Sequence, residues 1–280
     1  MRLGLIAGKG DIPRLIAENK RQAGEPIFVV GIKGQDEAWI QEFPHKICGI
    51  AEAGNVIRAL KSAECDTVSM IGNITRPDFT RLKPDLKAVS ILPRLVKAAT
   101  KGDDSLLRVL VEMFEEEGFD VVGAETLLSN LKGESGLLSQ CAPSETDIAD
   151  IRKCYDVAGE IGRLDIGQGA VVARGLVLAV EAQEGTDEML RRVAKLPEAI
   201  RGTEDQRCGV LVKRPKPDQE RRVDLPTIGP STVRLAAEAG LSAIAFIEGG
   251  ALIVNRSEIQ QLADAFKISV IGLTADGQLP

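Results

Sequence analysis

The sequence predicts an α/β protein of two domains, with a Rossmann-like parallel sheet over residues 1–130 and a C-terminal α/β domain with a mixed sheet over residues 145–280. First, 280 residues are more than one hydrophobic core usually organises. Second, short apolar runs alternate with amphipathic helical patterns in the first half, which is typical of a parallel sheet covered by helices. Third, residues 131–144 are rich in glycine and serine and lack periodicity, so they are expected to be the linker between the domains.

The N-terminal domain begins with a strand at 2–6, a glycine-rich turn and a helix at 12–22. This order is the first half of a nucleotide-binding βαβ unit, in which glycines allow close approach to the backbone and the helix N-terminus favours an anion. Gly8 and Gly10 match the start of the dinucleotide fingerprint, but Pro13 stands where its third glycine would be. The turn therefore either contacts a nucleotide or is only a tight structural turn. Further strands are expected at 27–30, 46–50, 67–71 and 119–122, and helices at 54–62, 86–99 and 104–116.

Two loops of this domain carry polar side chains. The loop at 72–77 follows a strand, which is where ligands bind open α/β sheets, and it offers an amide, a hydroxyl and a positive charge. Asp103 and Asp104 stand at the start of a predicted helix. Asp103 suits an N-cap, and the two carboxylates can also reach a cation or a sugar hydroxyl.

A proline-rich segment organises the C-terminal domain. Residues 209–232 begin as a buried strand and then contain four prolines among charged side chains of both signs. Because proline fixes φ and removes a backbone donor, this segment is held extended or in turns. A stiff polar loop between a strand and a helix suits the binding of a phosphate and a metal ion, and it can also be a solvated connection. Helices are expected at 145–163, 189–195, 231–239 and 257–265, a hairpin at 170–173 and 176–181, and strands at 243–247, 251–254 and 268–271.

Composition excludes several classes of function. The net charge of −6 and the pI of about 5.2 disfavour nucleic-acid binding. No apolar run is long enough to span a bilayer, and the N-terminus lacks the apolar core of a signal peptide, so a cytoplasmic location is expected. Because the sequence has a single histidine, His45, a histidine-ligated metal centre is excluded, and His45 is interpreted as a surface residue. The five cysteines form no CxxC pair and are expected to be free thiols. Hydrolytic chemistry would then depend on carboxylates, lysines and a hard cation.

Several segments resemble one family along the whole chain. They are GLIAGKGDIPRL, IGNITRP, GDDSLLR, DIGQGAVVARG with EAQEGTDEML, and LVKRPKPDQERRVDLPTIGPSTV followed by AAEAGLSAIA. The chain resembles the UDP-2,3-diacylglucosamine pyrophosphatases of the LpxI type, from lipid A biosynthesis. It departs from them at Glu220, where an aspartate is common, so a carboxylate is kept with one more methylene.

The resemblance implies a hydrolase that uses Mg²⁺ and water to attack the α-phosphorus of UDP-2,3-diacylglucosamine, giving UMP and 2,3-diacylglucosamine 1-phosphate. It also implies a homodimer that works at the cytoplasmic membrane surface, peripheral to the inner membrane. The family lacks the histidine-rich motif of the unrelated metallophosphatase that performs the same step, which agrees with the single histidine here.

The resemblance and the chemistry together select candidate site residues. Asp224 is expected to bind the metal or orient the water, although a salt bridge to Arg221 or Arg222 is the alternative. Lys213 is the first expected phosphate contact and Lys216 the second. The nucleotide or sugar would be held by Gly8, Asp11, Gly72, Asn73, Ile74, Thr75 and Asp103, with Gln168, Gly169 and Asp187 acting from the second domain. The two acyl chains need an apolar cleft, which is expected between the domains.

Two other classes of function compete with this hydrolase. The βαβ opening also suggests a nucleotide-sugar oxidoreductase, against which the incomplete glycine fingerprint argues. A non-catalytic nucleotide-binding protein is the other alternative. Release of UMP from UDP-2,3-diacylglucosamine with Mg²⁺ would separate the enzyme from a binding protein.

Overall fold

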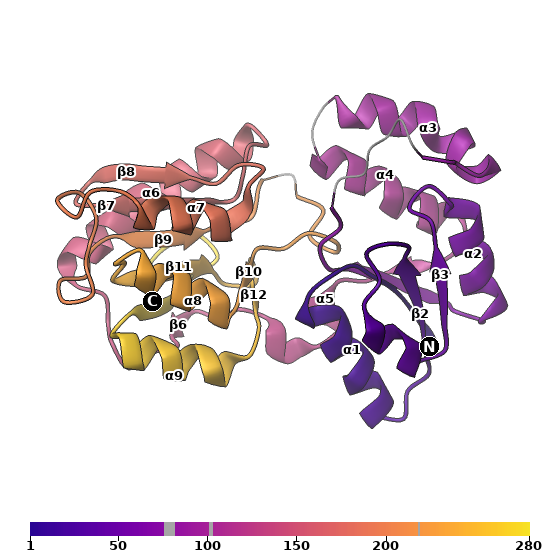
Figure 1. Cartoon of the computed structure of the whole chain (residues 1–280), viewed down its shortest axis with the longest axis horizontal. Coiled ribbons are helices and arrows are strands. Elements are labelled where there is room, and N and C mark those ends of the chain that lie inside the picture. The colour runs from indigo at the N-terminus through magenta and orange to yellow at the C-terminus, as the bar shows by residue number, and fades with distance from the viewer. Residues whose placement is uncertain (76–81, 101–102, 218) are drawn as a thin grey trace. The chain divides into compact units, whose positions relative to one another are not determined.

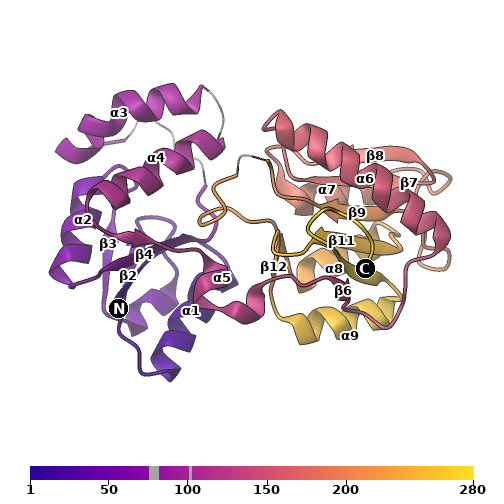
Figure 2. The same ribbon diagram turned by 180° about the vertical axis from the view of Figure 1, so that it is seen from behind.

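The computed structural model describes residues 1–75, 82–100, 103–217 and 219–280. The chain divides into two compact units, which Figures 1 and 2 draw from opposite sides. The first unit contains Met1–Leu128 and also Glu220–Asp224, and the second contains Ser129–Gln219 and Leu225–Pro280. The short segment Glu220–Asp224 is called the inserted turn below, because it leaves the second unit to become part of the first.

The first unit is built on a parallel sheet of five strands in the order β3-β2-β1-β4-β5. Its strands are β1 (Leu3–Ala7), β2 (Ile27–Ile32), β3 (His45–Cys48), β4 (Thr67–Ile71) and β5 (Asp120–Val121). Its helices are α1 (Asp11–Gln22), η1 (Ala38–Glu42), α2 (Ala53–Ser62), α3 (Leu86–Ala99), α4 (Asp103–Glu116) and α5 (Ala124–Leu127). The Rossmann-like parallel sheet is confirmed, and each expected helix begins within one residue of its predicted position.

The second unit is built on a mixed sheet in the order β6-β13-β11-β9-β7-β8. Its strands are β6 (Gly136–Leu137), β7 (Gly169–Ala173), β8 (Leu176–Val180), β9 (Val210–Lys213), β11 (Ala243–Ile247) and β13 (Ser269–Leu273), and β10 (Thr227–Ile228) pairs separately with β12 (Leu252–Ile253). Its helices are η3 (Ser129–Leu131), α6 (Glu145–Arg163), α7 (Gly185–Ala194), α8 (Pro230–Glu238) and α9 (Arg256–Phe266). The predicted mixed sheet is therefore confirmed, and α7 begins one turn earlier than the sequence indicates.

Alternation along the strands gives this sheet two buried faces. Val171, Leu211 and Ile244 pack against α7, α8 and α9, whereas Ala170 and Val210, on the opposite face, pack against α6. Figure 1 shows α7, α8 and α9 on the near side of the sheet, and Figure 2 shows α6 in front of it. Because successive side chains of a strand point to opposite faces, a run of consecutive apolar residues fits a sheet covered by helices on both sides.

The segment 131–144 is not a free linker. Strand β6 lies within it and pairs antiparallel with β13, and the Ser139 hydroxyl accepts a hydrogen bond from the backbone N–H of Val270 at 2.9 Å. The segment therefore belongs to the second unit. A short strand that pairs with a partner more than a hundred residues away leaves no periodicity in its own sequence, so the prediction of a linker was wrong.

Local polar chemistry fixes the ends of α6 and of the hairpin. Ser144 and Asp147 form a capping box at the start of α6. The turn between β7 and β8 uses Arg174 and Gly175 at φ +50° and +74°, which matches the Xaa-Gly turns that suit the twist of a hairpin. Asp150 of α6, only 3 % exposed, accepts the backbone N–H groups of both turn residues at 2.7 Å. A buried carboxylate therefore holds this turn against the helix.

Candidate functional site

Two glycines meet at the carboxyl ends of β1 and β4 in the first unit. After β1 the chain forms β2 and β3 on one side of β1, and it then returns to form β4 on the other side. The strand order therefore reverses between β1 and β4, and open α/β sheets bind ligands at such a point. A Cβ placed on Gly8 would lie 2.6 Å from the carbonyl carbon of Gly72, and one on Gly72 would lie 2.7 Å from that of Gly8. Only glycine fits at either position, because the neighbouring atoms are backbone.

The loops beyond these glycines are tied together by backbone hydrogen bonds. Lys9 and Asn73 exchange two N–H···O bonds of 2.9 Å each. Gln35, after β2, accepts the N–H of Thr75 at 2.6 Å and donates to its carbonyl at 3.2 Å. Sequence reasoning placed Gly8, Gly72, Asn73 and Thr75 in one site, and the structure brings them together. The adjoining Arg76 and Pro77 lie outside the described residues.

The start of α1 lies beside this crossing. Gly10 precedes the helix without a side-chain cap, so the N–H groups of the first turn are left for water or a ligand. Asp11 is the first helical residue and is exposed, and Ile74 is 42 % exposed. Asp103 begins α4, and its side chain lies outside the described part of the chain. An anion would find donors at α1, while Asp11 offers a carboxylate for hydroxyl or amide donors.

The inserted turn is anchored in the first unit by polar bonds. Asp104 accepts the N–H of Glu220 at 2.6 Å. Arg222 forms ion pairs with Glu220 at 2.8 Å and with Glu115 at 2.6 Å, and this guanidinium lowers the pKa of the Glu220 carboxyl. Val223 packs against the apolar core of the unit. The departure from the family pattern at Glu220 therefore falls on a residue that is fixed by Arg222.

Asp224 ends the inserted turn. Its backbone N–H donates to the carbonyl of Glu220 at 3.1 Å, and its side chain is partly buried. The carboxylate is thus held at the C-terminal end of a structured turn and does not belong to a free loop. The structure gives the place of Asp224, and its role as metal ligand or water-orienting group stays a prediction.

In the second unit, a buried hydrogen-bonded chain leads from a carboxylate to a lysine. Lys213 ends β9 and is 4 % exposed, and its Nζ donates to Thr186 Oγ1 at 2.7 Å and to the carbonyl of Thr227 at 3.4 Å. The Thr186 hydroxyl donates to Glu181 Oε1 at 2.9 Å. Glu181 is 6 % exposed, and its Oε2 is buried with no hydrogen-bond partner in the described chain. The predicted phosphate contact Lys213 is therefore buried and oriented by hydrogen bonds to neighbours that sequence reasoning did not select.

The other predicted residues of the second unit surround this chain. A Cβ on Gly169 would lie 2.5 Å from Glu181 Oε2, so this glycine makes room for the carboxylate. Gln168 accepts the N–H of Arg214 through its carbonyl at 2.8 Å and the side-chain amide of Gln219 at 3.0 Å. Asp187 lies in the first turn of α7, next to Thr186. The structure thus groups Gln168, Gly169 and Lys213 along β7 and β9, which are adjacent strands.

Lys216 already has an anionic partner. Its Nζ lies 2.5 Å from Asp165 Oδ1, and both side chains are mostly buried. Asp165 was not selected from the sequence, because it is far from Lys216 in the chain. A phosphate would have to share or displace this ion pair, so Lys213 is the better-placed cation.

The remaining titratable candidates have no catalytic setting. His45 is exposed, and its Nδ1 lies 2.8 Å from the carbonyl of Phe43. All five cysteines are free. Burial raises the pKa of the Cys208 thiol and that of Cys154, so both are kept as weak nucleophiles. The expectations of a surface histidine and of free thiols are confirmed.

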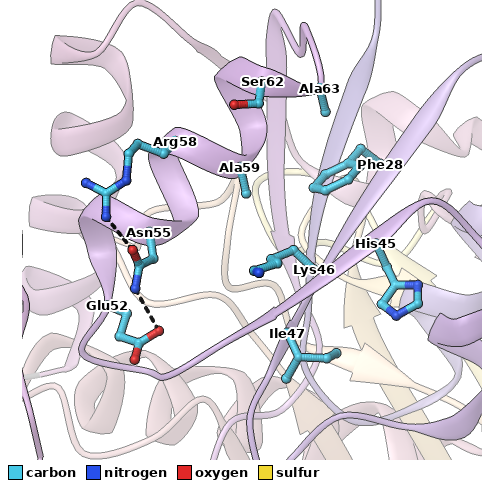
Figure 3. A pocket seen from close by; sticks show the side chains of 10 residues that line it. All are labelled: Phe28, His45, Lys46, Ile47, Glu52, Asn55, Arg58, Ala59, Ser62 and Ala63. Carbon is cyan, nitrogen blue, oxygen red and sulfur yellow. Dashed lines mark hydrogen bonds between the residues drawn. The ribbon is translucent and has the colours of Figure 1, made fainter.

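An open pocket of about 610 Å³ lies elsewhere in the first unit. Figure 3 shows Phe28, Ile47 and Ala59 on its walls, with Lys46 and the hydrogen-bonded row Glu52, Asn55 and Arg58 along α2. None of the residues selected from the sequence lines it. None of its lining residues belongs to the loops after β1 and β4, so we assign it no part in the site.

The described residues contain no group of three or more His, Cys, Asp or Glu side chains that could hold a metal ion. Mg²⁺ often takes only one or two protein carboxylates and completes its shell with water and substrate phosphates. Among the described residues, a divalent cation would therefore depend on few protein carboxylates and on the oxygens of a diphosphate. In the described chain, no helix has the length and apolar character needed to cross a membrane.

Comparison with known proteins covers almost the whole chain. The model of the LpxI N-terminal domain matches residues 2–131, and that of the LpxI C-terminal domain matches residues 134–271. The chain is 48 % identical over 272 residues to a protein of Caulobacter vibrioides named UDP-2,3-diacylglucosamine pyrophosphatase LpxI, covering 97 % of each chain. The two matched regions meet close to the boundary at Leu128 and Ser129 between the compact units.

Proposed function

This chain belongs to the LpxI family, and from that premise we propose that it hydrolyses the diphosphate of UDP-2,3-diacylglucosamine to UMP and 2,3-diacylglucosamine 1-phosphate in lipid A biosynthesis. The observation that carries the proposal is 48 % identity over 97 % of both chains to a protein named for this activity. The fold supports it with donor groups for a nucleotide at the β1–β4 crossing and a buried lysine at the end of β9.

We propose that the chemistry is attack of water on the α-phosphorus. The bond from this phosphorus to the bridging oxygen breaks, and the bridging oxygen leaves with the sugar 1-phosphate. Such a reaction needs an oriented water and neutralised phosphoryl oxygens. Asp224 would orient the water and accept its proton, and the Lys213 ammonium would contact a phosphoryl oxygen. Mg²⁺, held by Asp224 together with substrate oxygens and water, would supply further neutralisation of charge.

The first unit would hold the nucleotide or sugar. Gly8 and Gly72 leave the backbone open at the crossing, and the N–H groups at the start of α1 favour an anionic group. Thr75 and Asn73 are held in place by Gln35 and Lys9, so their positions are fixed before any ligand arrives. Preorganised donors of this kind lose little conformational entropy on binding.

We further propose that the chain meets the membrane surface through α3. Leu86, Val89, Leu92 and Val96 are 91 %, 49 %, 45 % and 58 % exposed and share one face of this helix. The helix contains no acidic residue, whereas Lys83 and Lys97 are exposed nearby. An apolar stripe beside exposed lysines complements an anionic lipid surface, and a diacylated substrate has to be taken from such a surface.

Vesicle binding tests this surface. Replacing the four α3 residues by serine should lower sedimentation with vesicles of phosphatidylglycerol and phosphatidylcholine. Leu176→Ser with Val177→Ser, which removes exposed apolar side chains from β8 instead, should not. Equal binding of both variants would exclude α3 as the contact. Light scattering of the α3 variant shows whether a second copy, rather than lipid, covers the stripe, and it also tests the predicted homodimer.

The reaction itself is tested by UMP release. The purified chain with UDP-2,3-diacylglucosamine and Mg²⁺ should release UMP, EDTA should abolish the release, and added Mg²⁺ should restore it. Asp224→Ala should lower turnover by about 10² to 10⁴ while the protein stays folded, whereas Asp205→Ala, at an exposed loop position, should leave it unchanged. Unaltered UMP release by Asp224→Ala would refute the role of this carboxylate.

A further inference from the structure

The donor and the acceptor are fixed in each hydrogen bond of the row Glu181–Thr186–Lys213. Thr186 has one hydroxyl proton, and it is donated to Glu181 Oε1 at 2.9 Å, so the hydroxyl oxygen is left to accept the Lys213 ammonium at 2.7 Å. A lysine has three N–H donors, of which this bond and the bond to the carbonyl of Thr227 use two. The third donor is therefore available to an anion.

Glu181 is held so that only one of its oxygens is used. Its backbone N–H donates to the carbonyl of Gly169 at 2.8 Å, and its carboxylate lies over the Cα of the same glycine. Oε1 accepts the Thr186 hydroxyl, whereas Oε2 is buried and has no partner among the described residues. A side chain that is 94 % buried and carries an unpartnered anionic oxygen costs free energy unless a ligand satisfies it.

Lys213 and Glu181 do not neutralise each other directly. No ion pair joins them among the described residues, since Thr186 lies between them. Lys213 thus offers a cation at one end of this hydrogen-bonded row, and Glu181 offers an anionic acceptor at the other end. The Thr186 hydroxyl fixes the spacing between them. A ligand that presents an anionic oxygen and, next to it, a hydrogen-bond donor would satisfy both ends.

We infer that Glu181, Thr186 and Lys213 form a binding subsite for the phosphosugar part of the substrate. Lys213 contacts a phosphoryl oxygen, Glu181 Oε2 accepts a hydrogen bond from a sugar hydroxyl or from the amide N–H at the adjoining carbon, and Thr186 is a positioning residue that fixes the two. This subsite rests on the proposed function and deepens it, because a diphosphate joined to an acylated amino sugar carries both groups side by side.

Three substitutions separate the parts of this subsite. Glu181→Gln keeps an oxygen for Thr186 and puts an NH₂ group where Oε2 lies, so it removes only the free acceptor. Thr186→Val removes the link, and Thr186→Ser restores it. Glu184→Gln is the matched control, because Glu184 precedes α7 and its carboxylate pairs with Arg192 at the surface.

The probe is UDP-N-acetylglucosamine, titrated by calorimetry in EDTA so that no metal contributes. Glu181→Gln should raise its Kd about tenfold or more, since the bond lost has a charged acceptor, and Glu184→Gln should leave it unchanged. With UDP-2,3-diacylglucosamine and Mg²⁺, Glu181→Gln should raise KM, Thr186→Val should lower kcat as well, and Thr186→Ser should recover most of it.

Each outcome decides the inference. An unchanged Kd for Glu181→Gln, or absence of probe binding to the parent protein, overturns it. It is also overturned if Glu181→Gln changes only the Mg²⁺ concentration needed for half-maximal activity, because Oε2 would then serve the ion. If the parent releases no UMP but the Kd ratio is as expected, the proposed reaction fails and the subsite stands. Thermal melts followed by circular dichroism identify a variant that is merely unfolded. If Thr186→Val does not fold, the Kd of Glu181→Gln still tests the inference.

Discussion

The crossing of Gly8 and Gly72 allows one substitution to be worked out in detail. In Gly8→Ala the new methyl group would lie 2.6 Å from the carbonyl carbon and oxygen of Gly72 and 2.8 Å from the carbonyl oxygen of Asn73. All three atoms are backbone, so no side chain can rotate away, and the two loops must separate. Separation weakens the two 2.9 Å bonds between Lys9 and Asn73.

The expected loss of stability follows from these contacts. Overpacking costs about 1–3 kcal/mol, and two weakened backbone hydrogen bonds add about 1 kcal/mol, which together give roughly 2–4 kcal/mol. For a unit of this size, such a loss lowers the melting temperature by about 6–16 °C. Calorimetry of the full chain should show this shift, and UMP release should fall because the nucleotide loops have moved.

The same substitution at a roomy position is the control. In Gly162→Ala, within α6, the nearest atom to the new methyl group lies 3.4 Å away, which is ordinary contact. Alanine is the better helix former, so this variant should be stabilised by about 0.5–1 kcal/mol. If Gly8→Ala melted at the temperature of the parent protein, the close backbone approach would not be a packing constraint and the argument would fail.

Two further predictions concern charged groups that hold elements together. Lys61 and Lys87 lower the pKa of the Glu117 carboxyl from 4.5 to about 2. The contribution of this carboxylate to stability is therefore complete above pH 4.5 and is lost as the pH falls towards 2. Glu117→Gln should flatten the decline of the free energy of unfolding, measured in urea, across this range. Asp150→Ala leaves two backbone N–H groups of the β7–β8 turn without their acceptor, which should cost about 2–4 kcal/mol of stability. Hydrogen exchange at Arg174 and Gly175 should become faster. Unaltered exchange at these two residues would contradict the role of Asp150.

Local patterns predicted most of the fold. Helix α6 is expected and found at residues 145–163, since its amphipathic pattern starts at a serine that forms a capping box. The strands of both sheets were found because buried strands are short apolar runs between turn residues. The exceptions β6 and β10 are each two residues long and pair with distant segments, so no period could reveal them.

The candidate site was predictable only in part. Gly8 and Gly72 were selected because glycine after a strand indicates a close backbone approach, and the structure gives the atoms that require it. Glu181 and Thr186 were not selected, because nothing in the local sequence indicates that they point towards a lysine on another strand. The ion pair of Lys216 with Asp165 depends likewise on a long-range contact.

The inserted turn has a consequence for the order in which the protein matures. Val223 fills part of the first unit's core, and Glu220 and Arg222 bind α4, yet these residues follow most of the second unit in the chain. During synthesis, when domains generally fold as they emerge from the ribosome, the N-terminal unit must wait with an incomplete surface until this late segment has been translated. Cutting the gene after the first family domain would therefore yield a fragment that lacks a piece of its own structure.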